Sequence, residues 1–227
     1  DRIAERDDET IKSITEALIF TGLAIGMTGT SRPASGEEHH LSHCWEMISM
    51  NEGRYTKWLH GNNVGVGVGI IAEAYSFVNN LDIETVYATG RYRHLDRNQW
   101  ARGLSEVYTR SAASIIKFKE GSIAFEAEQR ERNMKNIVKN WSAIKEICSE
   151  LLPNPEVIRG IMKQAGAICS PEELGLNREL FKKSFIAAKD IRKRYGILQL
   201  LEDIGMLEEA AEAVAAVYYD TPGTTIK

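Results

Sequence analysis

The sequence has few cysteines, little net charge and no long apolar run. Its 227 residues carry a formal net charge of -4, which provides no basic footprint for nucleic acid. The three cysteines are odd in number and widely spaced, so we expect no disulfide framework and a reducing, cytoplasmic location. The longest apolar run, from Ala17 to Met27, is interrupted by Thr21 and two glycines. Because this run is too short to span a bilayer, no membrane partner is expected.

A helix-start signal lies about 30 residues into the chain. Ser35, followed three residues later by Glu38, fits a capping box, in which the hydroxyl and the carboxylate each satisfy a free backbone amide. Pro33 keeps the helix from beginning earlier. We therefore expect a helix that begins near Gly36.

Two histidines in this predicted helix share a face. His39 and His43 lie four residues apart and so stand one above the other, whereas His40 points elsewhere. The pair could ligate one divalent metal ion, or one histidine could ligate while the other binds by hydrogen bonds or passes a proton. A third interpretation is a partly buried pair that serves only in packing.

A further histidine precedes an alternation of valine and glycine. His60 is followed by Gly61 and then by the alternating run from Val64 to Gly69. Small residues let backbones and a bound ion approach closely, so this third donor favours a metal site. The alternation is typical of a strand, but residues 70–75 favour a helix, and we predict a helix here.

Most of the remaining chain is also predicted to be helical. Asp7 or Asp8 should cap a helix that runs through Ile25, and its small-residue end, Gly22 to Gly29, should pack against the histidine helix. Core positions are predicted at Trp45, Met47, Ile48 and Met50, and charges at 126–132 are predicted to form a solvated face. Other helices are expected at 96–108, within 111–151, at 155–166, after a cap at 170–173, at 178–195 and at 198–219, with a connection at 82–90 and a frayed tail at 221–225.

The histidine region resembles a known family. Residues 22–39 read GLAIGMTGTSRPASGEEH and are followed by His43, His60-Gly61 and Val64-Gly65-Val66-Gly67. This pattern resembles the metal-binding core of the sn-glycerol-1-phosphate dehydrogenases. They belong to a superfamily that includes iron-dependent alcohol dehydrogenases, glycerol dehydrogenase and dehydroquinate synthase. Residues 171–176, 189–195 and 197–201 also resemble the tail of the bacterial, arabinose-operon-associated branch, so the likeness covers nearly the whole chain.

The resemblance implies roles for three histidines. His39 and His60 match the two metal-ligand histidines of the family, and His43 matches a histidine that contacts substrate and is placed for proton relay. The implied metal is zinc or nickel, which would polarise the hydroxyl or carbonyl group of the substrate. Arg32, in the loop before the histidine helix, would suit a phosphate oxygen, although a loop arginine is more often a surface ion-pair partner.

Two parts of the family pattern are missing from this sequence. Family members have an N-terminal nucleotide-binding domain with a glycine-rich phosphate loop, and a carboxylate metal ligand in a Gly-Asp segment. We therefore expect the chain to be a C-terminal piece of a longer enzyme, inactive alone, with NAD or NADP bound by the absent domain. The predicted fold is an all-α helical bundle over residues 1–227, with the metal-site helices in 1–80 and the remainder of the bundle in 81–227.

The resemblance also implies a reaction. The intact enzyme would interconvert dihydroxyacetone phosphate and sn-glycerol 1-phosphate, so its partner is a small phosphorylated substrate, and it would form a homodimer. One alternative is a glycerol dehydrogenase, another polyol dehydrogenase or a lyase-type synthase of the same superfamily, which would share the histidines. The other alternative is a non-catalytic helical interaction domain that keeps the histidines for packing.

Overall fold

The computed structural model describes residues 2–53 and 57–220. Within these ranges the chain forms helices and no strand, which confirms the predicted all-α class. The tail expected at 221–225 lies outside the described residues, and the division into residues 1–80 and 81–227 stays a prediction. The α-helices are α1 (Asp8–Thr28), α2 (Glu37–Asn51), α3 (His60–Asn79), α4 (Ile83–Thr89), α5 (Arg97–Tyr108), α6 (Ala112–Lys119), α7 (Ala127–Lys139), α8 (Trp141–Leu151), α9 (Pro155–Gln164), α10 (Arg178–Ala188), α11 (Ile197–Asp203) and α12 (Leu207–Tyr219).

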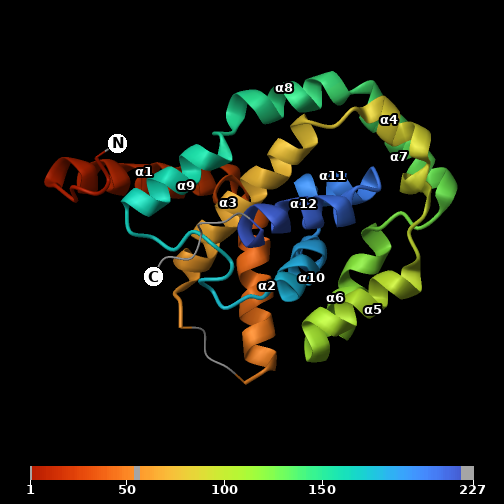
Figure 1. Cartoon of the computed structure of the whole chain (residues 1–227), viewed down its shortest axis with the longest axis horizontal. Helices are drawn as coiled ribbons and strands as arrows, with labels where there is room; N and C mark the ends of the chain where they lie inside the picture. The colour runs from red at the N-terminus through yellow and green to blue at the C-terminus, as the bar shows by residue number, and fades with distance from the viewer. Residues whose placement is uncertain (1, 54–56, 221–227) are drawn as a thin grey trace.

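Helices α2 and α3 form the centre of the bundle. They pack against each other, α10 lies against α2, and α9 and α12 lie against α3 (Figure 1). Burying a large apolar side chain in such a core contributes about 1.5–3 kcal/mol. The core includes Leu41, Val66, Ile70, Phe181, Phe185, Leu201 and Val214. Of the predicted core residues, Trp45 and Ile48 are buried and Met47 is partly buried, but Met50 is exposed because it lies in the last turn of α2.

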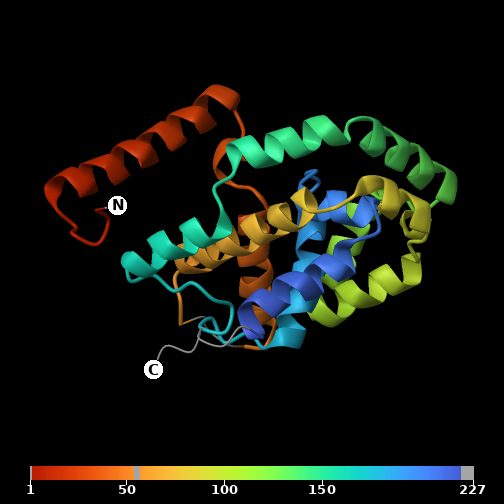
Figure 2. The same ribbon diagram turned by 45° about the horizontal axis from the view of Figure 1, so that its top comes forward.

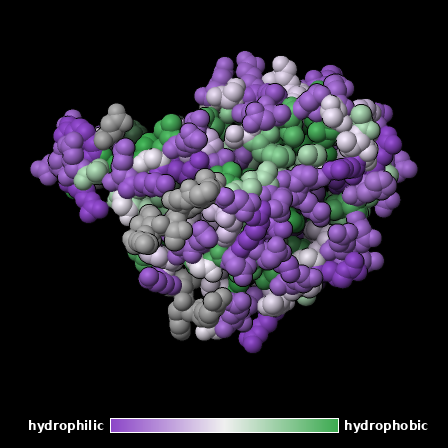
Figure 3. All heavy atoms as spheres, in the orientation of Figure 1, coloured by the Kyte–Doolittle hydropathy of each residue, from purple (hydrophilic) through white to green (hydrophobic). Residues whose placement is uncertain are grey.

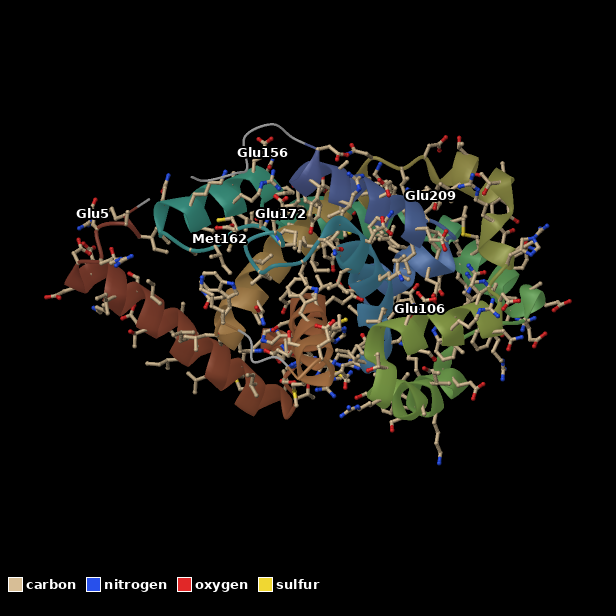
Figure 4. The ribbon with its side chains drawn as sticks, turned by 60° about the horizontal axis from the view of Figure 1, so that its bottom comes forward. Glu5, Glu106, Glu156, Met162, Glu172 and Glu209 are labelled. Atoms are coloured by element: carbon tan, nitrogen blue, oxygen red, sulfur yellow. The ribbon has the colours of Figure 1, made fainter. Side chains whose placement is uncertain are left out.

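The glycines of the valine–glycine run allow neighbouring helices to pack closely against α3. The run is helical, as predicted, and Gly65 and Gly69 lie on nearly the same face because they are four residues apart. A Cβ atom on Gly65 would lie 3.2 Å from Cε of Met162 on α9, and one on Gly69 would lie 3.1 Å from a tyrosine hydroxyl on α12. Met162 is labelled in Figure 4, where α9 runs beside α3. Gly67, on the other side of α3, lies so close to α2 that its Cβ would be 2.7 Å from the carbonyl oxygen of Glu38.

Helix α1 extends away from this bundle, and none of its residues is buried (Figures 1 and 2). Asp7 caps it as predicted, because its carboxylate accepts a hydrogen bond from the Thr10 amide at 2.8 Å. The expected packing of its small-residue end against α2 is wrong, since no atom of a neighbouring helix lies within 4 Å of a Cβ built on Gly22 or Gly26. Its exposed apolar side chains are Ile11, Ile14, Leu18, Ile19, Phe20, Leu23 and Met27.

The length of the apolar segment also needs correction. The apolar run ends at Met27, but α1 spans 21 residues and is long and apolar enough to cross a membrane by length and composition alone. Helices α3 and α4, bent by 86°, meet the same criteria when they are taken together. Core helices of globular proteins meet these criteria too. The criteria therefore do not show whether either segment lies in a membrane.

The outside of the bundle is mainly hydrophilic on the face shown in Figure 3. Most of the charged run at 126–132 is exposed, but the predicted solvated face is wrong for Arg130, which is 2% exposed. Its guanidinium donates to the carbonyl oxygens of Glu202, at 2.7 Å, and Tyr92. Glu131 accepts a hydrogen bond from the Tyr92 hydroxyl, which lowers the pKa of this carboxyl to about 2. These contacts join α7 to α11 and to the turn at Arg91–Arg93 through side chains that sequence pattern alone placed in solvent.

Several predicted boundaries differ from the structure. Residues 82–90, expected as a connection, contain α4, and residues 111–151 form α6, α7 and α8 in succession. The expected helix after the cap at 170–173 is a turn, and α10 ends at Ala188. The predicted helix at 198–219 is divided into α11 and α12 at Gly205, whose φ of 73° is a left-handed conformation that favours glycine.

Candidate metal centre

The start of α2 differs by one residue from the predicted capping box. Gly36, and not Ser35, is the N-cap, and the helix begins at Glu37. The Ser35 carbonyl oxygen instead accepts a hydrogen bond from the Arg194 guanidinium at 2.5 Å. The carboxylate half of the box survives, because Glu38 Oε1 accepts a hydrogen bond from the Gly36 amide at 2.6 Å. This contact fixes the Glu38 carboxylate next to the first histidine of the helix.

Three histidines converge where α2 meets the first residue of α3. The ring centroids of His39 and His43 are 6.4 Å apart, which agrees with the shared face predicted from their spacing. His60 begins α3 and lies 5.4 Å from His39 and 5.1 Å from His43, measured between ring centroids. The structure therefore brings together all three histidines that the sequence singled out.

Each of these rings directs its Nδ1 atom at a carboxylate. His39 Nδ1 lies 2.8 Å from Glu38 Oε1. His60 Nδ1 lies 2.7 Å from Glu46 Oε1, and His43 Nδ1 lies 3.2 Å from Glu46 Oε2. One carboxylate thus serves two histidines from different helices, and the Nε2 atoms of all three rings remain outside these contacts.

The two carboxylates are held in their charged forms. Partial burial opposes ionisation of Glu38, but its hydrogen bonds with the His39 ring and with the Gly36 amide keep its pKa below the usual range. Partial burial also opposes ionisation of Glu46, and the hydrogen bonds with His60 and His43 outweigh it in the same way. The site therefore presents two carboxylate anions beside the three imidazole rings at neutral pH.

The donor set fits a divalent transition metal. Imidazole nitrogen and carboxylate oxygen are the ligands that zinc and nickel accept in proteins. One potential ligand atom each from His43, Glu46 and His60 lies within 4.8 Å of the other two. Sequence reasoning did not select Glu46, although it lies three residues after His43 and seven after His39, a spacing that places it on the histidine face.

The adjacent face of α2 holds a histidine of another kind. His40 is 1% exposed, and neither of its ring nitrogens has a hydrogen-bond partner among the described residues. Burial, followed by the positive charge of Arg194, lowers the pKa of His40 to about 4. Burial likewise raises the pKa of Glu37 to about 7, while Glu37 Oε2 accepts a hydrogen bond from the Leu198 amide at 2.9 Å.

A cavity of about 610 Å³ borders this second face. His40, Glu37 and Arg32 line it, and none of the three converging histidines does, as far as the described residues show. Arg32 and Glu38 both line this cavity, and a contact of Arg32 with substrate phosphate stays a prediction.

The fold and this cluster define a class: an all-α domain with a histidine–carboxylate site suited to a divalent metal. Comparison with known proteins then identifies relatives, although no family model matches the chain. The chain is 29% identical over 214 residues to glycerol-1-phosphate dehydrogenase [NAD(P)+] of Geobacillus stearothermophilus, across 92% of this chain and 42% of that protein. It is 44% identical over 90 residues to the enzyme of the same name from Halalkalibacterium halodurans, across 40% of this chain and 22% of that protein.

A protein of the same name from Methanococcus maripaludis strain C7 is 39% identical over 79 residues, across 35% of this chain and 24% of its own length. These matches confirm the resemblance stated from the sequence: the chain is a relative of part of the glycerol-1-phosphate dehydrogenases. It spans less than half the length of the curated relatives that it matches. Its assignment to the bacterial, arabinose-operon-associated branch stays a prediction.

Proposed function

We propose that this chain is the C-terminal, metal- and substrate-carrying helical domain of an NAD(P)-dependent glycerol-1-phosphate dehydrogenase. The observation that carries the proposal is the convergence of His39, His43 and His60 within 6.4 Å, measured between ring centroids, in a relative of proteins with that name. All three rings also direct Nδ1 at a carboxylate. Packing alone would not require this shared orientation, whereas metal binding through Nε2 would benefit from it.

The proposed roles follow from where each ring lies. His39, from the first turn of α2, and His60, at the start of α3, would hold zinc or nickel through their Nε2 atoms. His43, one turn beyond His39, would contact the substrate and pass a proton at its own Nε2. A bound divalent ion would polarise the oxygen of the reacting carbon.

The proposed substrate is a small phosphorylated ketone or alcohol, with dihydroxyacetone phosphate and sn-glycerol 1-phosphate as the pair. Hydride would be exchanged with NAD or NADP bound by a domain that this chain does not contain. The name shared by the relatives supports this reaction. A homodimer and a cytoplasmic location, without membrane or nucleic-acid partners, complete the proposal.

The test uses the longer protein that the proposal implies, in which this chain is joined to its nucleotide-binding domain. After removal of metal with a chelator, reduction of dihydroxyacetone phosphate by NADH or NADPH should stop, and it should return when zinc or nickel is added. Since a Lewis-acid metal supplies several kcal/mol to such a reaction, His60→Ala should reduce kcat/KM by more than about a hundredfold. Turnover of glycerol but not of the phosphorylated pair would contradict the substrate, and metal-independent turnover would contradict the site.

A further inference from the structure

The Glu46 carboxylate lies between two histidines that come from different helices. Its Oε1 is 2.7 Å from His60 Nδ1 and its Oε2 is 3.2 Å from His43 Nδ1. Glu46 is on α2, so it reaches His43 within its own helix, at a spacing of three residues, and His60 across the contact with α3. Ser42 donates to Glu46 Oε1 at 3.3 Å and also lies 3.1 Å from His60 Nδ1, which steadies this arrangement from a third position.

We propose that Glu46 is a positioning residue that fixes His43 and His60 together in the tautomer protonated at Nδ1. A carboxylate accepts but cannot donate, so each ring must present Nδ1–H to it. The hydrogen bond from Nδ1 to the carboxylate keeps the proton on Nδ1. The free lone pair of each neutral ring is then on Nε2. This inference rests on the proposed function, in which His60 Nε2 would bind the metal and His43 Nε2 would contact the substrate.

Glu38 performs the same task for His39. Its Oε1 is 2.8 Å from His39 Nδ1, and the Gly36 amide holds the same oxygen in place. Histidines that bind metals generally donate their other ring N–H to a carboxylate or carbonyl group, which fixes the ring orientation and raises ligand basicity. The two carboxylates thus orient different histidines. Glu38 orients His39, and Glu46 orients both the proposed ligand His60 and the proposed proton-relay residue His43.

The competing role for Glu46 is direct ligation. Its carboxylate is near enough to the two histidines to be part of a three-ligand set. In that role a metal would have to bind, through the remaining lone pair, a carboxylate oxygen that already accepts a hydrogen bond from an imidazole N–H. Occupation of both oxygens by the two Nδ1 atoms therefore favours positioning over ligation.

The first test reads the tautomers without any metal. On the uniformly ¹⁵N-labelled 227-residue chain at about pH 8, above the ordinary imidazole pKa of about 6.5, long-range ¹H–¹⁵N correlation spectra distinguish Nδ1–H from Nε2–H rings. We expect Nδ1–H for His39, His43 and His60. In Glu46→Ala, His43 and His60 should move toward Nε2–H while His39 stays unchanged, and Glu38→Ala should change His39 alone.

His94, on the exposed surface, serves as the internal reference, and Glu128→Gln, on α7 away from the cluster, is the matched control. Circular dichroism of each variant verifies that the helices are intact. Wild-type His43 and His60 protonated at Nε2, or tautomers that Glu46→Ala leaves unchanged in a folded chain, would overturn the proposal.

The second test measures the affinity of the wild type and of Glu46→Gln for Zn²⁺ by competition with an indicator dye. Loss of an outer carboxylate typically weakens binding about 10- to 100-fold, so Glu46→Gln should do so while one ion per chain still binds. Complete loss of stoichiometric binding with unchanged tautomers would make Glu46 a ligand and overturn the positioning role. If the wild type shows the expected tautomers but binds no Zn²⁺, the proposed function fails and the tautomer assignment stands.

Discussion

Two neighbouring histidines of α2 occupy opposite environments. The His39 side chain is 22% exposed and its Nδ1 faces Glu38, whereas His40 is 1% exposed and has no hydrogen-bond partner among the described residues. One residue along an α-helix is a rotation of about 100°, which turns one ring toward the histidine cluster and buries the other in the interior. Helical phase, rather than residue type, therefore decides which histidine can take part in chemistry.

The largest expected effect comes from the buried face. Trp45 is 3% exposed and its indole N–H donates to Ser184 Oγ at 2.9 Å. Trp45→Ala removes this bond and leaves a large cavity, so the free energy of unfolding should fall by about 3–5 kcal/mol in urea denaturation. His43→Ala, on the other face and two residues away, should cost less than about 1 kcal/mol. Equal losses for the two variants would contradict the division of α2 into a core face and a site face.

The second effect is a pH dependence due to His40. Its pKa in the folded chain is about 4, below the ordinary imidazole value of about 6.5 in the unfolded chain. Between these values the unfolded state binds a proton that the folded state does not, so His40 contributes a fall in stability of about 3 kcal/mol as the pH is lowered from 6.5 to 4, a slope that the raised pKa of Glu37 opposes. His40→Gln, which does not titrate, should reduce this slope in urea denaturation series at several pH values. An unchanged slope would show that other groups cause it.

The third effect tests the contact that holds the two faces in place. A Cβ on Gly67 would lie 2.7 Å from the Glu38 carbonyl oxygen, so Gly67→Ala must push α3 away from α2. We expect a loss of about 1–3 kcal/mol in the free energy of unfolding, with weaker metal binding as His60 shifts. The matched control is Gly65→Ala, whose Cβ meets only the flexible end of Met162 at 3.2 Å. Because alanine favours helix by about 1 kcal/mol over glycine, the control should be neutral or stabilising.

The smallest effect is expected on α1. Leu18 is 68% exposed, so Leu18→Gln should change the free energy of unfolding by no more than about 0.5 kcal/mol. A loss above about 2 kcal/mol in the same denaturation experiment would show that the apolar side of α1 is covered in solution.

The sequence predicted those features that depend on local spacing. Asp7 caps the helix expected after it, and the four-residue step from His39 to His43 correctly placed both rings on one face. Local patterns do not contain the distance between helices, so the shared contact of Glu46 with His60 was not foreseen. The exposure of α1 was missed for the same reason, since an apolar pattern shows which side of a helix needs a partner but not whether one is present.

The most direct test of the central claim compares Zn²⁺ affinity after substitutions on the two faces of α2. In calorimetric titrations of the 227-residue chain, His39→Ala and His60→Ala should each weaken binding at least about tenfold, because each removes a proposed ligand. His40→Gln should bind one ion with the affinity of the wild type. Equal weakening by His39→Ala and His40→Gln, or no binding to the folded wild type, would contradict the account.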